Sequence, residues 1–125
     1  MLSFALGCGR APDAYEPDNS CSMAKPLAVG ETQRRTIHMK RDRDWMRVQV
    51  EAGRRDRFRV SGVTGSAPVR LSLYPSCNGV ERSTGGAGRN RFFDWQADRS
   101  GAVFLHTICD KPTAYEISVT EQPGS

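Results

Sequence analysis

The sequence predicts an all-β protein, a jelly-roll-like antiparallel β-sandwich of about seven to eight strands. Short segments in which apolar and polar residues alternate recur along the chain, and clusters of Gly, Pro, Asp and Asn separate them. No segment of ten or more residues has the 3.6-residue apolar repeat of a long helix. The 125 residues suffice for one hydrophobic core and exclude a multidomain enzyme.

Seven strands are expected, over residues 33–39, 45–51, 57–61, 69–74, 91–96, 102–109 and 115–120. One short helical turn is expected near residues 20–25. We expect residues 1–12 to be a signal remnant or linker, residues 13–120 to form the domain, and residues 121–125 to form a polar tail.

Alternation in the strands over 45–51 and 57–61 places their apolar residues in the core and three arginines outside: Arg47, Arg57 and Arg59. A tight turn at Gly53 predicts that these strands form a hairpin, so the three arginines would share one face. Such a patch could bind an anionic polysaccharide or a lipid headgroup; a solvated face of paired charges is the alternative. Further core candidates are Phe104, Ile108, Ile117 and Val119.

The net charge is +4, and fifteen of the eighteen basic residues are Arg. Residues 33–60 hold ten basic and four acidic side chains, an excess that is compatible with an acidic partner. Nucleic acid is not an expected partner, because most aromatic residues occupy inward positions and cannot form a base-stacking platform.

Four cysteines, Cys8, Cys21, Cys77 and Cys109, are dispersed without a CxxC motif, so zinc is not expected. Dispersed cysteines in a small chain fit disulfides formed in an oxidising compartment. A Cys77–Cys109 disulfide is favoured because it would hold the long connection over residues 78–91. Pairing of Cys21 with either of them stays open.

The first nine residues, MLSFALGCG, resemble the end of a bacterial lipoprotein signal with Cys8 as the lipidated residue. No apolar run approaches the roughly 18 residues of a transmembrane helix. A secreted or cell-envelope protein with a possible lipid anchor is therefore expected.

An ordered set of motifs resembles the bacterial pre-peptidase C-terminal domain. Asp13 to Ser20 (DAYEPDNS) is similar to the family's Tyr-Glu-Pro-Asn-Asp-Ser opening, and Asp42-Arg43-Asp44-Trp45 to its Asp-x-Asp-Trp. Its later strands and turns resemble VQVEAG (48–53), LSLY (71–74), SGAVF (100–104) and YEISV (115–119).

The resemblance implies a non-catalytic accessory domain of an exported protein. Relatives in clostridial collagenases bind substrate and calcium, which makes five residues candidate calcium ligands: Glu16, Asp18, Asn19, Asp42 and Asp44. Hard oxygens of this kind are what Ca²⁺ prefers. Turn formation and ion pairs with neighbouring arginines are the alternative role of these residues.

The expected function is binding or accessory work on an extracellular protein or polysaccharide by a monomer. The alternative is a structural or processing domain without a ligand of its own. No catalytic motif surrounds His38 or His106, so an enzyme is not expected. Trp45, Trp95 and Tyr74 could form a sugar-stacking surface, with core packing as the alternative.

Overall fold

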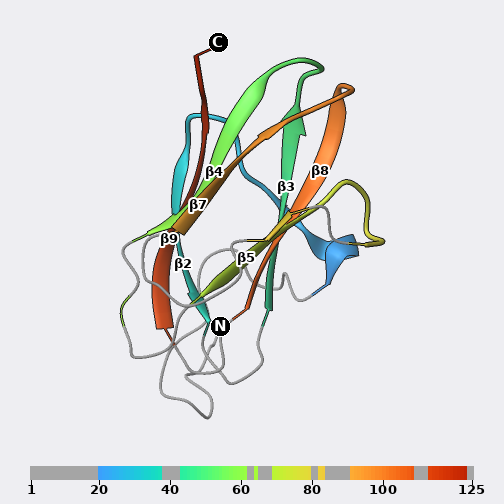
Figure 1. Cartoon of the computed structure of the whole chain (residues 1–125). Coiled ribbons are helices and arrows are strands. Elements are labelled where there is room, and N and C mark those ends of the chain that lie inside the picture. The colour runs from blue at the N-terminus through green and yellow to red at the C-terminus, as the bar shows by residue number, and fades with distance from the viewer. Residues whose placement is uncertain are drawn as a thin grey trace.

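The chain forms two β-sheets packed face to face (Figure 1). The structure, a computed structural model, describes residues 20–37, 43–61, 64, 69–79, 82–83, 91–108 and 113–123. One sheet has five strands in the order β1-β3-β8-β5-β6, and the other has four in the order β2-β9-β4-β7. This architecture confirms the predicted sandwich.

Nine strands and one 3₁₀ turn make up the described elements. They are η1 (Cys21–Met23), β1 (Lys25–Pro26), β2 (Thr32–Ile37), β3 (Arg43–Val50), β4 (Arg55–Ser61), β5 (Arg70–Tyr74), β6 (Arg82–Ser83), β7 (Arg91–Gln96), β8 (Gly101–Ile108) and β9 (Thr113–Glu121).

All seven predicted strands are present, as is the helical turn. The two strands that were not predicted, β1 and β6, have two residues each, too few to show an alternation. β1 pairs parallel with β3, whereas every other pair of strands in the described residues is antiparallel. β9 extends through Glu121, the first residue of the predicted polar tail.

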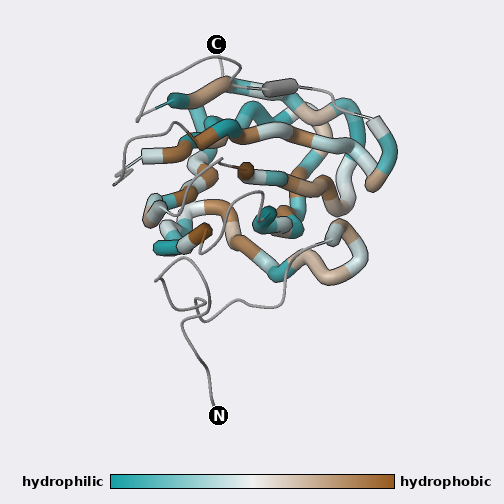
Figure 2. The backbone as a smooth tube through the Cα atoms, turned by 90° about the horizontal axis from the view of Figure 1, so that it is seen from below, coloured by the Kyte–Doolittle hydropathy of each residue, from teal (hydrophilic) through white to brown (hydrophobic). Residues whose placement is uncertain are grey.

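The core lies between the sheets, and alternation along the strands supplies it. Figure 2 looks along the sandwich and shows apolar and polar positions exchanging along the strands of both layers. The fully buried apolar side chains include Met46, Val48, Phe58, Val60 and Ile117. These inward positions were predicted correctly.

The predicted faces of β8 are wrong. Val103 and Leu105 are buried in the core, so Phe104 and Ile108, which have the opposite parity, lie on the outer face of the sheet. Apolar residues occupy adjacent positions in this strand, and alternation alone therefore does not select its inner face.

The predicted hairpin between β3 and β4 is also wrong. β3 pairs with β1 and β8, whereas β4 pairs with β7 and β9 in the other sheet. Gly53, with a φ of 83°, supplies the tight turn as expected, but the chain crosses there from one sheet to the other. A turn signal indicates chain reversal and does not say whether the two strands pair or face each other across the core.

The disulfide joins Cys21 to Cys77, with a Cα–Cα distance of 5.8 Å, so the favoured Cys77–Cys109 pairing is wrong. Cys21 begins η1, and Cys77 follows β5; in Figure 1 the yellow loop after β5 reaches the blue segment around η1. The two cysteines are 56 residues apart in sequence, and the sheet topology brings them together. Cys109 and Cys8 lie outside the described residues, as does the segment 1–12.

Within the described part of the chain, no helix has the length and apolar character needed to cross a membrane.

Candidate binding surface

The structure divides the predicted arginine patch between the two outer faces of the sandwich. Arg57 and Arg59 project from β4 on the outer face of the four-stranded sheet, whereas Arg47 lies on β3 of the five-stranded sheet. Arg47 Nη1 donates a hydrogen bond to the Ala24 carbonyl at 3.2 Å. The prediction of one shared face failed because it depended on the β3–β4 hairpin.

Arg57 and Arg59 instead meet two side chains of β7. The register pairs Arg57 with Asp94 and Arg59 with Phe92. Arg57 Nε and Nη2 donate to the two Asp94 carboxylate oxygens at 2.8 and 3.1 Å, a bidentate ion pair. We call these four residues, Arg57, Arg59, Phe92 and Asp94, the arginine–phenylalanine surface.

Phe92 is the centre of this surface and is 48% exposed. The Arg57 guanidinium carbon lies 4.1 Å from the ring centroid, and that of Arg59 lies 5.2 Å from it, both within cation–π range. The alternation of β7 sends Phe93 into the core and leaves Phe92 outside. Sequence analysis missed Phe92, although the adjacent pair Phe92-Phe93 in a strand requires one of the two rings to face away from the core.

The charges of the arginine–phenylalanine surface are unevenly compensated. The hydrogen bond from Arg57 lowers the pKa of Asp94, and the same bond raises the pKa of Arg57. Arg59 forms no ion pair with any carboxylate among the described residues. The surface therefore presents a half-exposed ring, one guanidinium in a bidentate ion pair with Asp94, and one guanidinium without a direct ion pair among the described residues.

One further ion pair lies on the same outer face. On the neighbouring strands β2 and β9, Arg34 Nη1 lies 3.9 Å from Glu116 Oε2, and both side chains are largely exposed. An exposed pair at this distance contributes little to stability. The face as a whole combines cationic groups with an apolar ring, which suits an acidic ligand that also has apolar groups.

The predicted calcium ligands do not form a described site. Glu16, Asp18, Asn19 and Asp42 lie outside the described residues. Within the described residues, no group of three or more His, Cys, Asp or Glu side chains is placed to hold a metal. The calcium site remains a prediction.

Asp44, the fifth candidate ligand, is fully buried between the sheets. Its Oδ2 accepts a hydrogen bond from the Tyr115 hydroxyl, which also contacts Thr107 Oγ1. Burial and the nearby Asp44 charge raise the pKa of Tyr115 well above its usual value. Arg35 and Gln33 lie on the side of β2 that faces the core, and Arg35 Nε donates a hydrogen bond to Gln33 Oε1 at 3.2 Å. Sequence analysis did not predict this buried polar cluster, because a buried Arg cannot be distinguished from an exposed one by alternation.

The proposed aromatic surface is only partly assembled. Trp45 lies on the outer face of the five-stranded sheet with its ring centroid 5.0 Å from Tyr74 and 4.6 Å from His106. Trp95 is in the other sheet, on the inner side of β7, edge-on to Phe58 at 6.3 Å.

Burial and the positive charge of Arg43 lower the pKa of His106 to about 4, so the imidazole is neutral at pH 7. His38 lies outside the described residues.

No protein-family model matches the chain, and no curated protein matches it. Several solved structures share its fold, among them the two that follow. One, PliG of Aeromonas hydrophila, a periplasmic lysozyme inhibitor of g-type lysozyme, is 13% identical with a TM-score of 0.50 and covers 77% of this chain and 98% of its own. The other, the pre-peptidase C-terminal domain of a collagenase from Bacillus anthracis, is 15% identical with a TM-score of 0.65 and covers 77% of this chain and 93% of its own. The chain thus has the fold of a pre-peptidase C-terminal domain, as its sequence motifs predicted.

Proposed function

We propose that this chain is a non-catalytic accessory module of the bacterial cell exterior, and that it binds an acidic segment of a partner protein through the arginine–phenylalanine surface. One observation carries the proposal: Phe92 is half-exposed and has two guanidinium groups against its ring. An exposed aromatic ring has a hydration cost that binding removes, and Arg and aromatic side chains are the residues most enriched at protein-binding hot spots.

The contacts of Phe92 favour a protein partner over a polysaccharide. The Arg57 guanidinium, 4.1 Å from the centroid, already occupies part of the ring that a sugar would need for stacking. Arg57 is held there by its bidentate bond to Asp94, so displacing it would break an existing ion pair. An acidic peptide can instead pair with Arg59 and pack an apolar side chain against the ring edge.

An extracytoplasmic location is supported by the Cys21–Cys77 disulfide, which needs an oxidising compartment. One structural neighbour, PliG, is a periplasmic inhibitor, which agrees with this location. Lipidation of Cys8 would attach the module to a membrane surface, and intact-mass measurement of protein purified from the bacterial membrane fraction tests this part of the proposal.

Binding is tested with a fluorescent Asp/Glu-rich peptide that carries two Leu or Phe residues, by anisotropy at low and at physiological salt. Phe92→Ser and Arg59→Gln are each expected to weaken binding by about tenfold or more. Arg47→Gln is the matched control, because it removes the same charge from the opposite face of the sandwich. The affinity should fall as salt rises, since the surface is cationic.

Three outcomes would contradict this proposal. If Arg47→Gln weakens binding as much as Arg59→Gln does, net charge and not the arginine–phenylalanine surface governs the interaction. If the peptide does not bind, heparin does bind, and Arg59→Gln abolishes the heparin binding, the ligand is an anionic polysaccharide. If neither probe binds, the alternative of a structural or processing domain without a ligand gains support.

Calcium stabilisation is a separate part of the proposal, carried by the carboxylates of Glu16, Asp18 and Asp42. Millimolar calcium is expected to raise the melting temperature by several degrees relative to EDTA, since a ligand at 100 times its Kd stabilises by about 2.7 kcal/mol. Asp42→Ala should remove the shift. Asp44→Ala is unsuitable as the test variant because Asp44 holds the buried Tyr115 hydroxyl, and its loss would destabilise the fold with or without metal.

A further inference from the structure

A groove lies at the end of the sandwich where the chain crosses from β7 to β8. It has a volume of about 650 Å³ and is lined by apolar groups of Val50, Trp95 and Val103 and by polar groups of Gln96, Asp98 and Arg99. This volume falls within the range of pockets that bind small ligands. Neither Arg57, Arg59 nor Phe92 lines the groove, so it is distinct from the arginine–phenylalanine surface.

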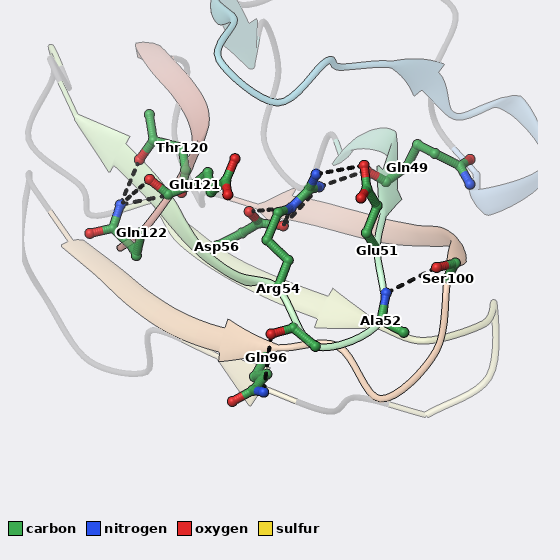
Figure 3. A network of polar contacts seen from close by, with 11 residues as sticks. Gln49, Glu51, Ala52, Arg54, Asp56, Gln96, Ser100, Thr120, Glu121 and Gln122 are labelled. Carbon is green, nitrogen blue, oxygen red and sulfur yellow. Dashed lines mark hydrogen bonds and ion pairs between the residues drawn. The ribbon is translucent and has the colours of Figure 1, made fainter. Parts of the chain in front are cut away.

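Hydrogen bonds between two turns hold the polar wall of the groove in place. Gly53 N donates to the Ala97 carbonyl at 2.8 Å, and Ala97 N donates to the Arg54 carbonyl at 3.2 Å. Figure 3 shows two further bonds, from Ala52 N to Ser100 Oγ at 2.9 Å and from Gln96 Nε2 to the Gly53 carbonyl at 3.1 Å. The β7–β8 turn is therefore fixed to the β3–β4 turn before any ligand binds, which reduces the ordering cost of binding.

The β3–β4 turn is itself anchored in the protein. Arg54 Nε lies 3.0 Å from Asp56 Oδ1, and Arg54 Nη1 lies 3.0 Å from Glu51 Oε2 (Figure 3). Asp56 is buried and Arg54 is largely covered, so the Arg54–Asp56 contact is shielded from water, whereas Glu51 is exposed. The groove is thus a preformed feature of the fold.

The chemistry of the groove selects an uncharged polar ligand. Asp98 and Arg99 are both exposed at its rim, and their charges cancel, so neither an anion nor a cation is favoured overall. A carboxylate acceptor, a guanidinium donor and an amide can bond several hydroxyl groups of one ligand. Trp95, which packs against the core and is only partly buried, adds an apolar side chain to the lining of the groove.

We propose that the groove binds a neutral sugar unit of a glycan chain. The Trp95 indole would pack against the apolar C–H face of the sugar ring, and Asp98, Arg99 and Gln96 would exchange hydrogen bonds with its hydroxyl groups. A charged sugar would be attracted by one of Asp98 and Arg99 and repelled by the other, so its charge would add no net attraction. This site does not depend on the proposed protein-binding surface, and it would give the module a second ligand.

The test uses the intact protein with a Trp45→Phe substitution, which leaves Trp95 as the single tryptophan. Cellotetraose, maltotetraose and N-acetylchitotetraose are titrated separately while Trp95 emission is recorded. At least one of these neutral oligosaccharides is expected to change the emission saturably. Asp98→Ala and Arg99→Ala, both exposed positions, should each weaken that binding by about tenfold, the effect of removing one charge-assisted hydrogen bond.

Phe92→Ser is the matched control and should leave sugar binding unchanged, so the two proposed sites fail or succeed independently. Thermal melts of Asp98→Ala and Arg99→Ala should match the parent, which separates loss of binding from loss of folding. The proposal is overturned if none of the three oligosaccharides gives a saturable signal. It is equally overturned if both alanine variants bind as tightly as the parent.

Discussion

The two outer faces of the sandwich carry similar residues in different states. On the five-stranded sheet, Trp45 is 7% exposed and in contact with the rings of Tyr74 and His106. On the four-stranded sheet, Phe92 is 48% exposed and meets two guanidinium groups. An aromatic ring enclosed by other rings stabilises the fold, whereas a half-exposed ring beside guanidinium groups is accessible to a partner. The difference supports the proposal that the four-stranded face binds a partner, whereas the aromatic cluster of the five-stranded face stabilises the fold.

The largest expected effect is a loss of stability that distinguishes Trp45 from Phe92. Trp45→Ala should lower the free energy of unfolding by about 3–5 kcal/mol, because it removes a large buried side chain. Phe92→Ala should change it by about 0.5 kcal/mol or less, because the ring is half-exposed. Urea denaturation measures both. Equal losses in the two variants would contradict the division of roles between the faces.

The disulfide should provide the next largest effect, and it belongs to the five-stranded side of the molecule. In the chain-entropy model, removing a link that closes a 56-residue separation lowers stability by about 4 kcal/mol. Cys21→Ser and Cys77→Ser should therefore destabilise the protein equally, as judged from denaturation midpoints. Cys109→Ser is the control and should have a much smaller effect. A Cys77–Cys109 peptide in a non-reducing digest would contradict the pairing.

His106 should make the stability of the five-stranded side sensitive to acid. Its pKa is lowered by burial from 6.5 to about 4, so the unfolded chain takes up a proton at a pH where the folded protein does not. The contribution of neutral His106 to stability is complete above pH 6.5 and is lost as pH falls toward 4. The free energy of unfolding should decrease by about 3 kcal/mol between pH 7 and pH 4 for this reason. His106→Gln should remove that part of the pH dependence. An unchanged slope in this variant would show that other groups cause it.

The smallest effect is expected on the four-stranded face. Asp94→Asn should lower stability by at most about 1 kcal/mol at neutral pH, because the Arg57–Asp94 pair is partly exposed. The pKa of Asp94 is lowered by its bond to Arg57, so this contribution is present above the ordinary carboxyl pKa and disappears as pH falls below it. Glu116→Gln, which removes the looser pair with Arg34, should have a still smaller effect. A larger loss in Glu116→Gln would contradict this ranking.

Prediction from the sequence succeeded where the signal is local. The β3 and β4 core positions followed from strict alternation, and the sandwich followed from the number and spacing of strands. It failed for the inner face of β8, where apolar residues are adjacent. It also failed at the β3–β4 turn, because the two strands were expected to pair with each other, whereas they lie in different sheets. The candidate surface was predicted in part, since Arg57 and Arg59 share it with Phe92 and Asp94 and not with Arg47.

The sequence by itself determined the seven longer strands, the turns between them and the resemblance of the fold to a pre-peptidase C-terminal domain, because backbone preference and alternation depend on neighbouring residues. Tertiary structure alone decided three things: the division of the arginines between two faces, the pairing of Cys21 with Cys77, and the groove beside Trp95. Each of these depends on which distant segments lie together. That choice follows from burying all the apolar faces at once, a condition that no single segment of the chain specifies.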